Sequence, residues 1–183
     1  EDFKKYCKAD KILVVGLTHL GDMVLLSPFL YNLRRDFPKA KIDILSKEQV
    51  SEILAYCPHI NNRIIYNAKW VTSKKGGEGF IKTFNIISQL KRNHYDLSFV
   101  THPHIYSNII PWLARIPFRV GYSDGADGFL NIRFEKESQI QHARNYPLNL
   151  LRYLDLEVES EKLEIYLGPQ DIAFAEEFRK SLP

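Results

Sequence analysis

Short apolar runs alternate with longer amphipathic stretches along this chain, and that alternation limits its possible folds more than any other feature. Residues 11–17 (KILVVGL) are apolar and rich in β-branched side chains, which is typical of a parallel strand buried on both faces. Over residues 25–37, apolar side chains recur at spacings of three and four, which predicts an amphipathic helix. Pro28 interrupts that helix, so it either kinks there or restarts with Ser27 as an N-cap.

The same alternation continues through most of the chain. Ser46 and Gln49 have the spacing of a capping box, which predicts a helix that ends before Pro58. Further strands are predicted at residues 41–45, 63–66, 96–101 and 118–121, and further helices at residues 80–93, 107–115 and 142–154. Because parallel neighbours need long crossover connections, usually helices, this order predicts an α/β protein with a Rossmann-like, doubly wound parallel sheet.

The last stretch of the chain differs from the rest. Gly168 and Pro169 precede an amphipathic helix at residues 171–182, but no predicted strand remains for that helix to pack on. We therefore expect residues 1–165 to form one Rossmann-like domain. Residues 166–183 are predicted to be a linker and the first helix of a further domain that this sequence does not contain.

Composition excludes several classes of protein. The 25 Lys and Arg residues exceed the 22 Asp and Glu residues by only three, which is too little to indicate a nucleic-acid partner. No run approaches the ~18 apolar residues of a membrane-spanning helix. Cys7 and Cys57 show neither CxxC nor Cys/His metal spacing, so we expect reduced thiols, no metal site and a cytoplasmic protein. Peripheral attachment to a membrane stays open.

The loop after the first strand is the first place to look for a ligand, because ligands bind outside the carboxyl ends of parallel strands. Its sequence, residues 17–23 (LTHLGDM), lacks the GxGxxG of dinucleotide-binding loops and the GxxxxGK of nucleotide-triphosphate loops. It places Asp22 after Gly21 at a helix start, where backbone amides favour an ionised carboxylate. Such a carboxylate either accepts a proton from a bound hydroxyl or is merely a first-turn charge. Position alone does not decide between the two.

Residues 68–79 form a second candidate, since they contain three glycines and read as a long loop on the same edge of the sheet. Lys69, Lys74 and Lys75 are suited to phosphates or anionic lipid headgroups as mobile point charges. Trp70 favours an interfacial role. The alternative is an ordinary solvated loop.

Two further positions follow or begin predicted strands. His102 and His104 flank Pro103 after the strand at residues 96–101, and hydrogen bonding to hydroxyls of a ligand is favoured over metal binding because no third ligand lies near in sequence. Arg119 either binds a phosphate of a ligand or caps the end of its strand.

Five separated segments carry a family resemblance. They are KILVVGLTHLGDMVLLSPFLYNLRRDFPKAKIDIL, NNRIIYN, YDLSFVTHP, the P-x-R-x-G-Y turn (Pro117, Arg119, Gly121, Tyr122) and HARNYPLNLLRYLDL, together spanning about residues 11–156. In this order and spacing, the chain resembles the lipopolysaccharide heptosyltransferases of glycosyltransferase family 9.

The resemblance implies the N-terminal half of a GT-B fold, in which two Rossmann-like domains face a cleft. It implies an inverting transfer in which Asp22 is the general base and no metal or other cofactor is needed. The acceptor, a growing lipopolysaccharide core, would be held by this half, with contacts expected from Thr18, His19, Gly21, His102, Arg119 and the three lysines. The donor, typically ADP-heptose, would bind mainly to the absent half. His19 departs from the family's usual small residue, so it either contacts an acceptor phosphate or packs beside the turn.

Two functions from different classes follow. The first is an inverting glycosyltransferase acting on a phosphorylated, lipid-linked saccharide at the inner face of the inner membrane, of which this chain alone is inactive. The second is a non-catalytic Rossmann-type module that binds an anionic glycan or a nucleotide. An oxidoreductase is disfavoured by the missing GxGxxG.

Overall fold

Six parallel strands form the centre of the molecule. The computed structural model describes residues 3, 8–67, 77–102, 105–123, 127–135 and 142–182. The strands lie in the order β3-β2-β1-β4-β5-β6, and every neighbouring pair is parallel. Their bounds are β1 (Lys11–Gly16), β2 (Lys41–Ser46), β3 (Asn62–Ile65), β4 (Leu97–Val100), β5 (Phe118–Tyr122) and β6 (Ile132–Phe134). This is the strand order of a Rossmann fold, so the predicted fold class is confirmed.

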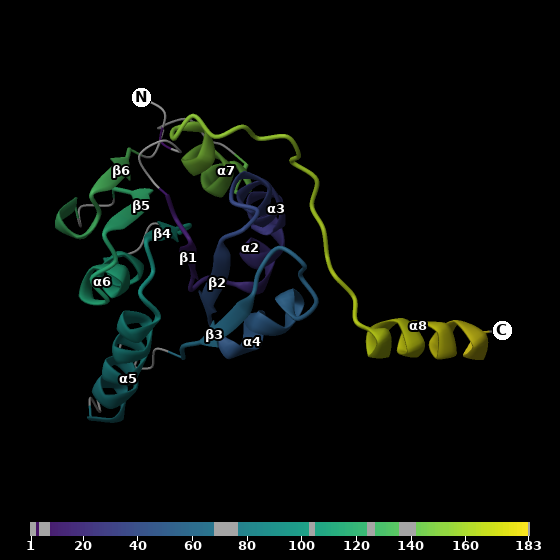
Figure 1. The fold of residues 1–183 in the computed structure, drawn as a ribbon. Helices are drawn as coiled ribbons and strands as arrows, with labels where there is room; N and C mark the ends of the chain where they lie inside the picture. The colour runs from purple at the N-terminus through teal and green to yellow at the C-terminus, as the bar shows by residue number, and fades with distance from the viewer. Residues whose placement is uncertain are drawn as a thin grey trace.

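Helices cover both faces of the sheet (Figure 1). The helices that lie on the sheet are α2 (Leu20–Leu25), α3 (Ser27–Asp36), α4 (Glu48–Ser51), α5 (Gly77–Asn93), α6 (Ile105–Leu113) and α7 (Asn145–Arg152), with the short 3-10 turns η1 (Glu52–Leu54) and η3 (Asp127–Phe129). Helix α8 (Pro169–Ser181) lies apart from the sheet. Strand β1 shows how the layers arise. Ile12 and Val14 belong to the core beneath α2, α3 and α7, whereas Leu13 and Val15 belong to the core beneath α5 and α6. Side chains alternate between the two faces of a strand, so a continuous apolar run fills both cores.

The helix after β1 is divided at Pro28. Helix α2 ends at Leu25 and α3 begins at Ser27 with Pro28 in its first turn, where a proline costs no helical hydrogen bond. The restart predicted as one alternative is therefore confirmed. Ser27 is not the N-cap, however, because Leu26 occupies that position and the Ser27 hydroxyl donates to the Val24 carbonyl over 2.8 Å.

Other predictions of local structure need correction. Ser46 does not open a capping box, because it is the last residue of β2 and pairs with Gly16 of β1; Lys47 is the N-cap of α4. Strand β6 was not predicted, since its three residues are too few to show a pattern. Helix α5 begins at Gly77, within the stretch that the sequence suggested was a loop.

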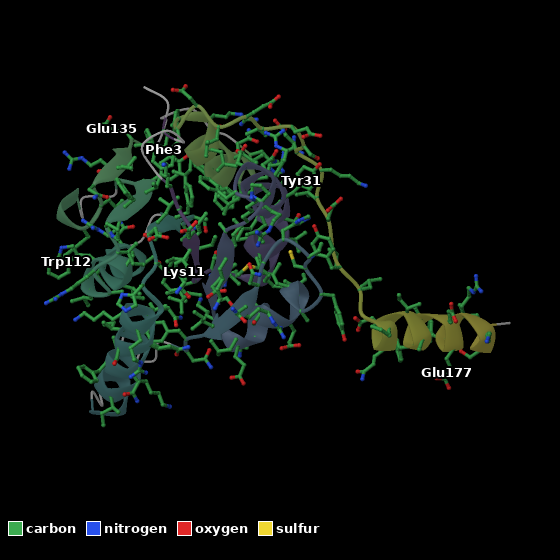
Figure 2. All side chains as sticks on the ribbon, in the orientation of Figure 1. Phe3, Lys11, Tyr31, Trp112, Glu135 and Glu177 are labelled. Atoms are coloured by element: carbon green, nitrogen blue, oxygen red, sulfur yellow. The ribbon has the colours of Figure 1, made fainter. Side chains whose placement is uncertain are left out.

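The chain leaves the sheet domain through an extended segment, residues 157–168, which we call the strap. It lies along α3, where the buried Asn32 amide donates to the Ser160 carbonyl and the Asn32 carbonyl oxygen accepts the Glu159 amide, both over 2.7 Å. Helix α8 follows and projects away from the body, with no buried residue and with Phe174 71% exposed (Figures 1 and 2). The predicted division near residue 165 stays a prediction. None of the helices described is long and apolar enough to cross a bilayer.

Candidate functional site

The chain leaves β1 and β4 in opposite directions, and a pocket lies where it does so. These two strands are neighbours, yet β1 leads through α2 and α3 to β2, while β4 leads through α6 to β5 on the other side. Such a switch point opens a crevice at the carboxyl ends of the strands. A pocket of about 130 Å³ occupies this edge, lined by Thr18, Asp22, Leu25, Leu26, Thr101, His102, Ala143, Tyr146 and Pro147.

Asp22 lies in this pocket at the third position of α2. Its carboxylate oxygen Oδ2 accepts a hydrogen bond from the Thr18 hydroxyl and a second, over 3.3 Å, from the backbone amide of His19. His19 is the N-cap residue of α2, so the second bond satisfies an amide that the helix itself leaves unpaired. The fold thus holds the Asp22 side chain in one place.

Opposing effects act on the ionisation of Asp22. Partial burial raises the pKa of its carboxyl group, because a charge is less well solvated there. Hydrogen bonds from Thr18 and the His19 amide, and the nearby imidazoles of His102 and His19, together lower this pKa below its ordinary value. The carboxylate is consequently ionised at neutral pH and able to accept a proton.

The opposite wall comes from β4. Thr101 follows this strand, and its hydroxyl and amide both donate to the carbonyl of Val15, over 3.1 and 3.3 Å. These bonds fix the end of β4 beside the end of β1. His102 follows Thr101, is exposed and lines the pocket. Asp22 and His102, which are 80 positions apart in the sequence, therefore line the same pocket, as the parallel sheet predicted.

The third wall of the pocket is the start of α7, which no pattern in the sequence indicates. Tyr146 and Pro147 line the pocket, and the Tyr122 hydroxyl of β5 donates to the Tyr146 carbonyl over 2.7 Å. The Tyr122 and Tyr146 rings pack edge to face, with centroids 5.9 Å apart. The segment HARNYPLNLLRYLDL carried the family resemblance, but nothing in its periodicity indicates that it closes the pocket.

The other predicted contacts are placed differently. Thr18 is buried beside Asp22 and lines the pocket, whereas His19 and Gly21 are exposed and are not among its lining residues. Arg119 is the second residue of β5, near the amino end of the sheet, and its guanidinium donates to the carbonyls of Phe129 and Ile116 over 2.7 and 2.6 Å. The structure therefore does not bring Arg119 to the pocket, and these contacts match the alternative of a structural cap.

Several predicted residues fall outside the part of the chain that the structure describes. These are Lys69, Lys74, Lys75 and His104, with Trp70 and Cys7. Cys57 is buried and forms no disulfide. Within the described ranges, no three His, Cys, Asp or Glu side chains are grouped so that they would hold a metal ion.

Comparisons with known proteins agree with the resemblance. No protein-family model matches the chain. Lipooligosaccharide heptosyltransferase 2 of Haemophilus ducreyi is 28% identical over 168 residues, which cover 90% of this chain and 43% of that protein. Lipopolysaccharide heptosyltransferase 2 of Salmonella typhimurium is 26% identical over 80% of this chain and 39% of its own length. The chain thus spans about two fifths of the length of these relatives.

A solved structure gives the fold independently. The glycosyl transferase family 9 protein of Veillonella parvula superposes with a TM-score of 0.82 at 23% identity, over 95% of this chain and 51% of that one. The predicted resemblance is confirmed: the relatives of this chain are lipopolysaccharide heptosyltransferases, and its fold is that of glycosyltransferase family 9.

Proposed function

We propose that this chain is the acceptor-binding half of an inverting glycosyltransferase that extends a lipopolysaccharide core. The observation that carries the proposal is the ionised carboxylate of Asp22, which lies in the pocket at the carboxyl ends of β1 and β4. The relatives of this chain are heptosyltransferases. A general base must lie within hydrogen-bond reach of the proton that it accepts and must be unprotonated at working pH. Asp22 is unprotonated at neutral pH in the free protein. Because it lines the pocket, it would also lie within hydrogen-bond reach of a hydroxyl bound there.

The proposed reaction uses Asp22 once. An acceptor hydroxyl donates its proton to the Asp22 carboxylate while its oxygen forms a bond to the anomeric carbon of the sugar. The bond from that carbon to the diphosphate of the nucleotide breaks, and the nucleoside diphosphate leaves with the bonding electron pair. Attack from the face opposite the leaving group inverts the anomeric configuration. No metal takes part in this scheme.

We propose that the donor is bound mainly by a second domain. Residues 1–165 form the acceptor domain in this proposal, and residues 166–183 form the linker and the first helix of the donor domain. The exposed side chains of α8 support this division, because the sheet domain covers none of them. More than half of the length of each relative lies outside the part that matches this chain, which leaves room for such a domain. ADP-heptose is the proposed donor.

The proposed acceptor is a phosphorylated, lipid-linked saccharide. The imidazoles of His19 and His102 lie near Asp22, and an imidazole N–H can donate a hydrogen bond to a phosphate oxygen of a ligand at the pocket. Lys69, Lys74 and Lys75 stay predicted contacts to acceptor phosphates or to headgroups. This acceptor would bring the protein to the inner face of the inner membrane as a peripheral protein.

Activity assays on two polypeptides test the proposal. The purified chain of 183 residues should bind a phosphorylated core saccharide weakly and transfer no sugar, whereas the full-length protein should transfer heptose from ADP-heptose with inversion. Transfer by the chain alone would overturn the division into two domains. Acceptor binding without transfer by the full-length protein would favour the non-catalytic module.

A further inference from the structure

Both hydrogen bonds that described residues make to the Asp22 carboxylate go to the same oxygen. Both the Thr18 hydroxyl and the His19 amide donate to Oδ2. No residue in the described part of the chain hydrogen-bonds to Oδ1. Because Asp22 also lines the pocket, Oδ1 is the oxygen that remains for a ligand's proton.

Thr18 is well suited to fix this arrangement. It follows β1 by two residues and is only 5% exposed, so water competes little for its hydroxyl. A β-branched side chain is restricted at χ1, which keeps the hydroxyl aimed in one direction. A hydroxyl that donates to an ionised carboxylate makes a charge-assisted bond, stronger than one between neutral groups.

We infer that Thr18 is a positioning residue for the transfer reaction: its hydroxyl binds Oδ2 of Asp22 and leaves Oδ1 to accept the proton of the acceptor hydroxyl. This inference rests on the proposed role of Asp22 as general base. It goes further by assigning the two oxygens different tasks and by naming the residue that separates them.

The electrostatics of the site agree with this assignment. Partial burial raises the pKa of Asp22, and the Thr18 hydrogen bond is the foremost effect that lowers it again. The other titratable groups that face the carboxylate are the imidazoles of His19 and His102, and the Tyr146 phenol lines the same pocket from α7. Replacing Thr18 leaves these three side chains in place, so the effect of the Thr18 hydroxyl on the pKa of Asp22 can be measured separately from the effects of the other groups.

The competing explanation is that Thr18 only stabilises the start of α2. Thr18→Val removes the hydroxyl and keeps the shape, whereas Thr18→Ser keeps the hydroxyl. Loss of a purely structural bond would lower the melting temperature but leave kcat unchanged at a pH where Asp22 is ionised, whereas loss of a positioning bond would lower kcat there. Thr18→Ala replaces Thr18→Val in the experiment if valine prevents folding.

The test is an NMR titration of the full-length protein labelled with 13C at the aspartate carboxyl carbons, with Asp22 assigned from the signal lost in Asp22→Asn. In the wild type, Asp22 should titrate below the ordinary value of about 3.9. Thr18→Val should raise this pKa, and Thr18→Ser should return it to that of the wild type. The acid limb of the pH profile of kcat/KM should move in the same direction.

Two outcomes separate the possible failures. If the wild type transfers sugar but Asp22 titrates in Thr18→Val as it does in the wild type, the role of Thr18 is overturned and the proposed function stands. If the NMR shift occurs but the wild type transfers no sugar from any nucleotide-sugar, the proposed function fails, and with it the catalytic purpose of the arrangement.

Discussion

Asn32 of α3 hydrogen-bonds both the carbonyl and the amide of Ser160, which lies 128 positions later in the chain, over 2.7 and 3.3 Å. Asn32 is fully buried, and its amide group also donates to the Pro28 carbonyl within α3. A single side chain thus joins the helix beside the pocket to the strap that leads to α8.

Replacing Asn32 should loosen the strap. Asn32→Ala leaves the Ser160 carbonyl and the Glu159 amide of the strap, which are partly buried, without these partners, so the free energy of unfolding should fall by about 1 to 3 kcal/mol. Urea unfolding measures this change, and limited proteolysis should show faster cleavage within residues 157–168. Asn85→Ala on the exposed face of α5 is the matched control and should change neither. Equal stability of the Asn32 and Asn85 variants would contradict the role given to Asn32.

Arg119 tests the choice between a structural and a binding role. Because its guanidinium donates to three backbone carbonyls, those of Phe129, Ile116 and Pro117, both Arg119→Ala and Arg119→Lys should destabilise the domain, by about 1 to 3 kcal/mol. A lysine keeps the charge but cannot reproduce the guanidinium's planar set of donors. Unfolding curves and acceptor affinity are measured for each variant. If lysine preserves stability and alanine weakens only acceptor binding, Arg119 contacts phosphate instead.

The lysines of residues 68–79 give a test of acceptor chemistry. Changing Lys69, Lys74 and Lys75 together to Ala should weaken binding of a phosphorylated acceptor and spare a dephosphorylated one. Each basic residue near an anionic surface contributes about 1 kcal/mol, so the affinity for the phosphorylated acceptor should fall by roughly tens-fold to a hundred-fold. Added salt should weaken wild-type binding in the same way, because exposed charges are screened over ~8 to 10 Å.

The control removes the same charge elsewhere. Lys8, Lys39 and Lys162 are exposed lysines outside the pocket, and changing them together to Ala should leave both affinities unchanged. Equal losses for phosphorylated and dephosphorylated acceptor in the first triple variant would indicate an effect on folding. No loss for either acceptor would make residues 68–79 a solvated connector.

The sequence predicted what periodicity and strand order determine. The apolar run of β1 and the amphipathic pattern after it were enough to place Asp22 at the carboxyl edge of a parallel sheet. The same reasoning put His102 on that edge, and the pocket contains both residues.

What the sequence did not predict depends on contacts between distant segments. Tyr146 closes the pocket because Tyr122 holds the start of α7 in place, and no local pattern contains that relationship. Arg119 was grouped with the binding residues because its turn belongs to the family motif, yet it lies near the amino end of β5. Ser46 had the spacing of a capping box, but pairing with β1 extended β2 through it. Tertiary pairing prevailed over a local preference.

Substitution of Asp22 tests the central claim most directly. In the full-length enzyme, Asp22→Asn should fold and bind acceptor as the wild type does, because an amide keeps the size and an oxygen acceptor for the Thr18 hydroxyl. It cannot accept the substrate's proton, so kcat should fall by about 10² to 10⁴. Asp10→Asn, which removes an exposed carboxylate outside the pocket, is the control and should transfer at the wild-type rate. An Asp22→Asn enzyme whose kcat stays within about threefold of the wild type would contradict the account and reduce Asp22 to a charge at the start of a helix.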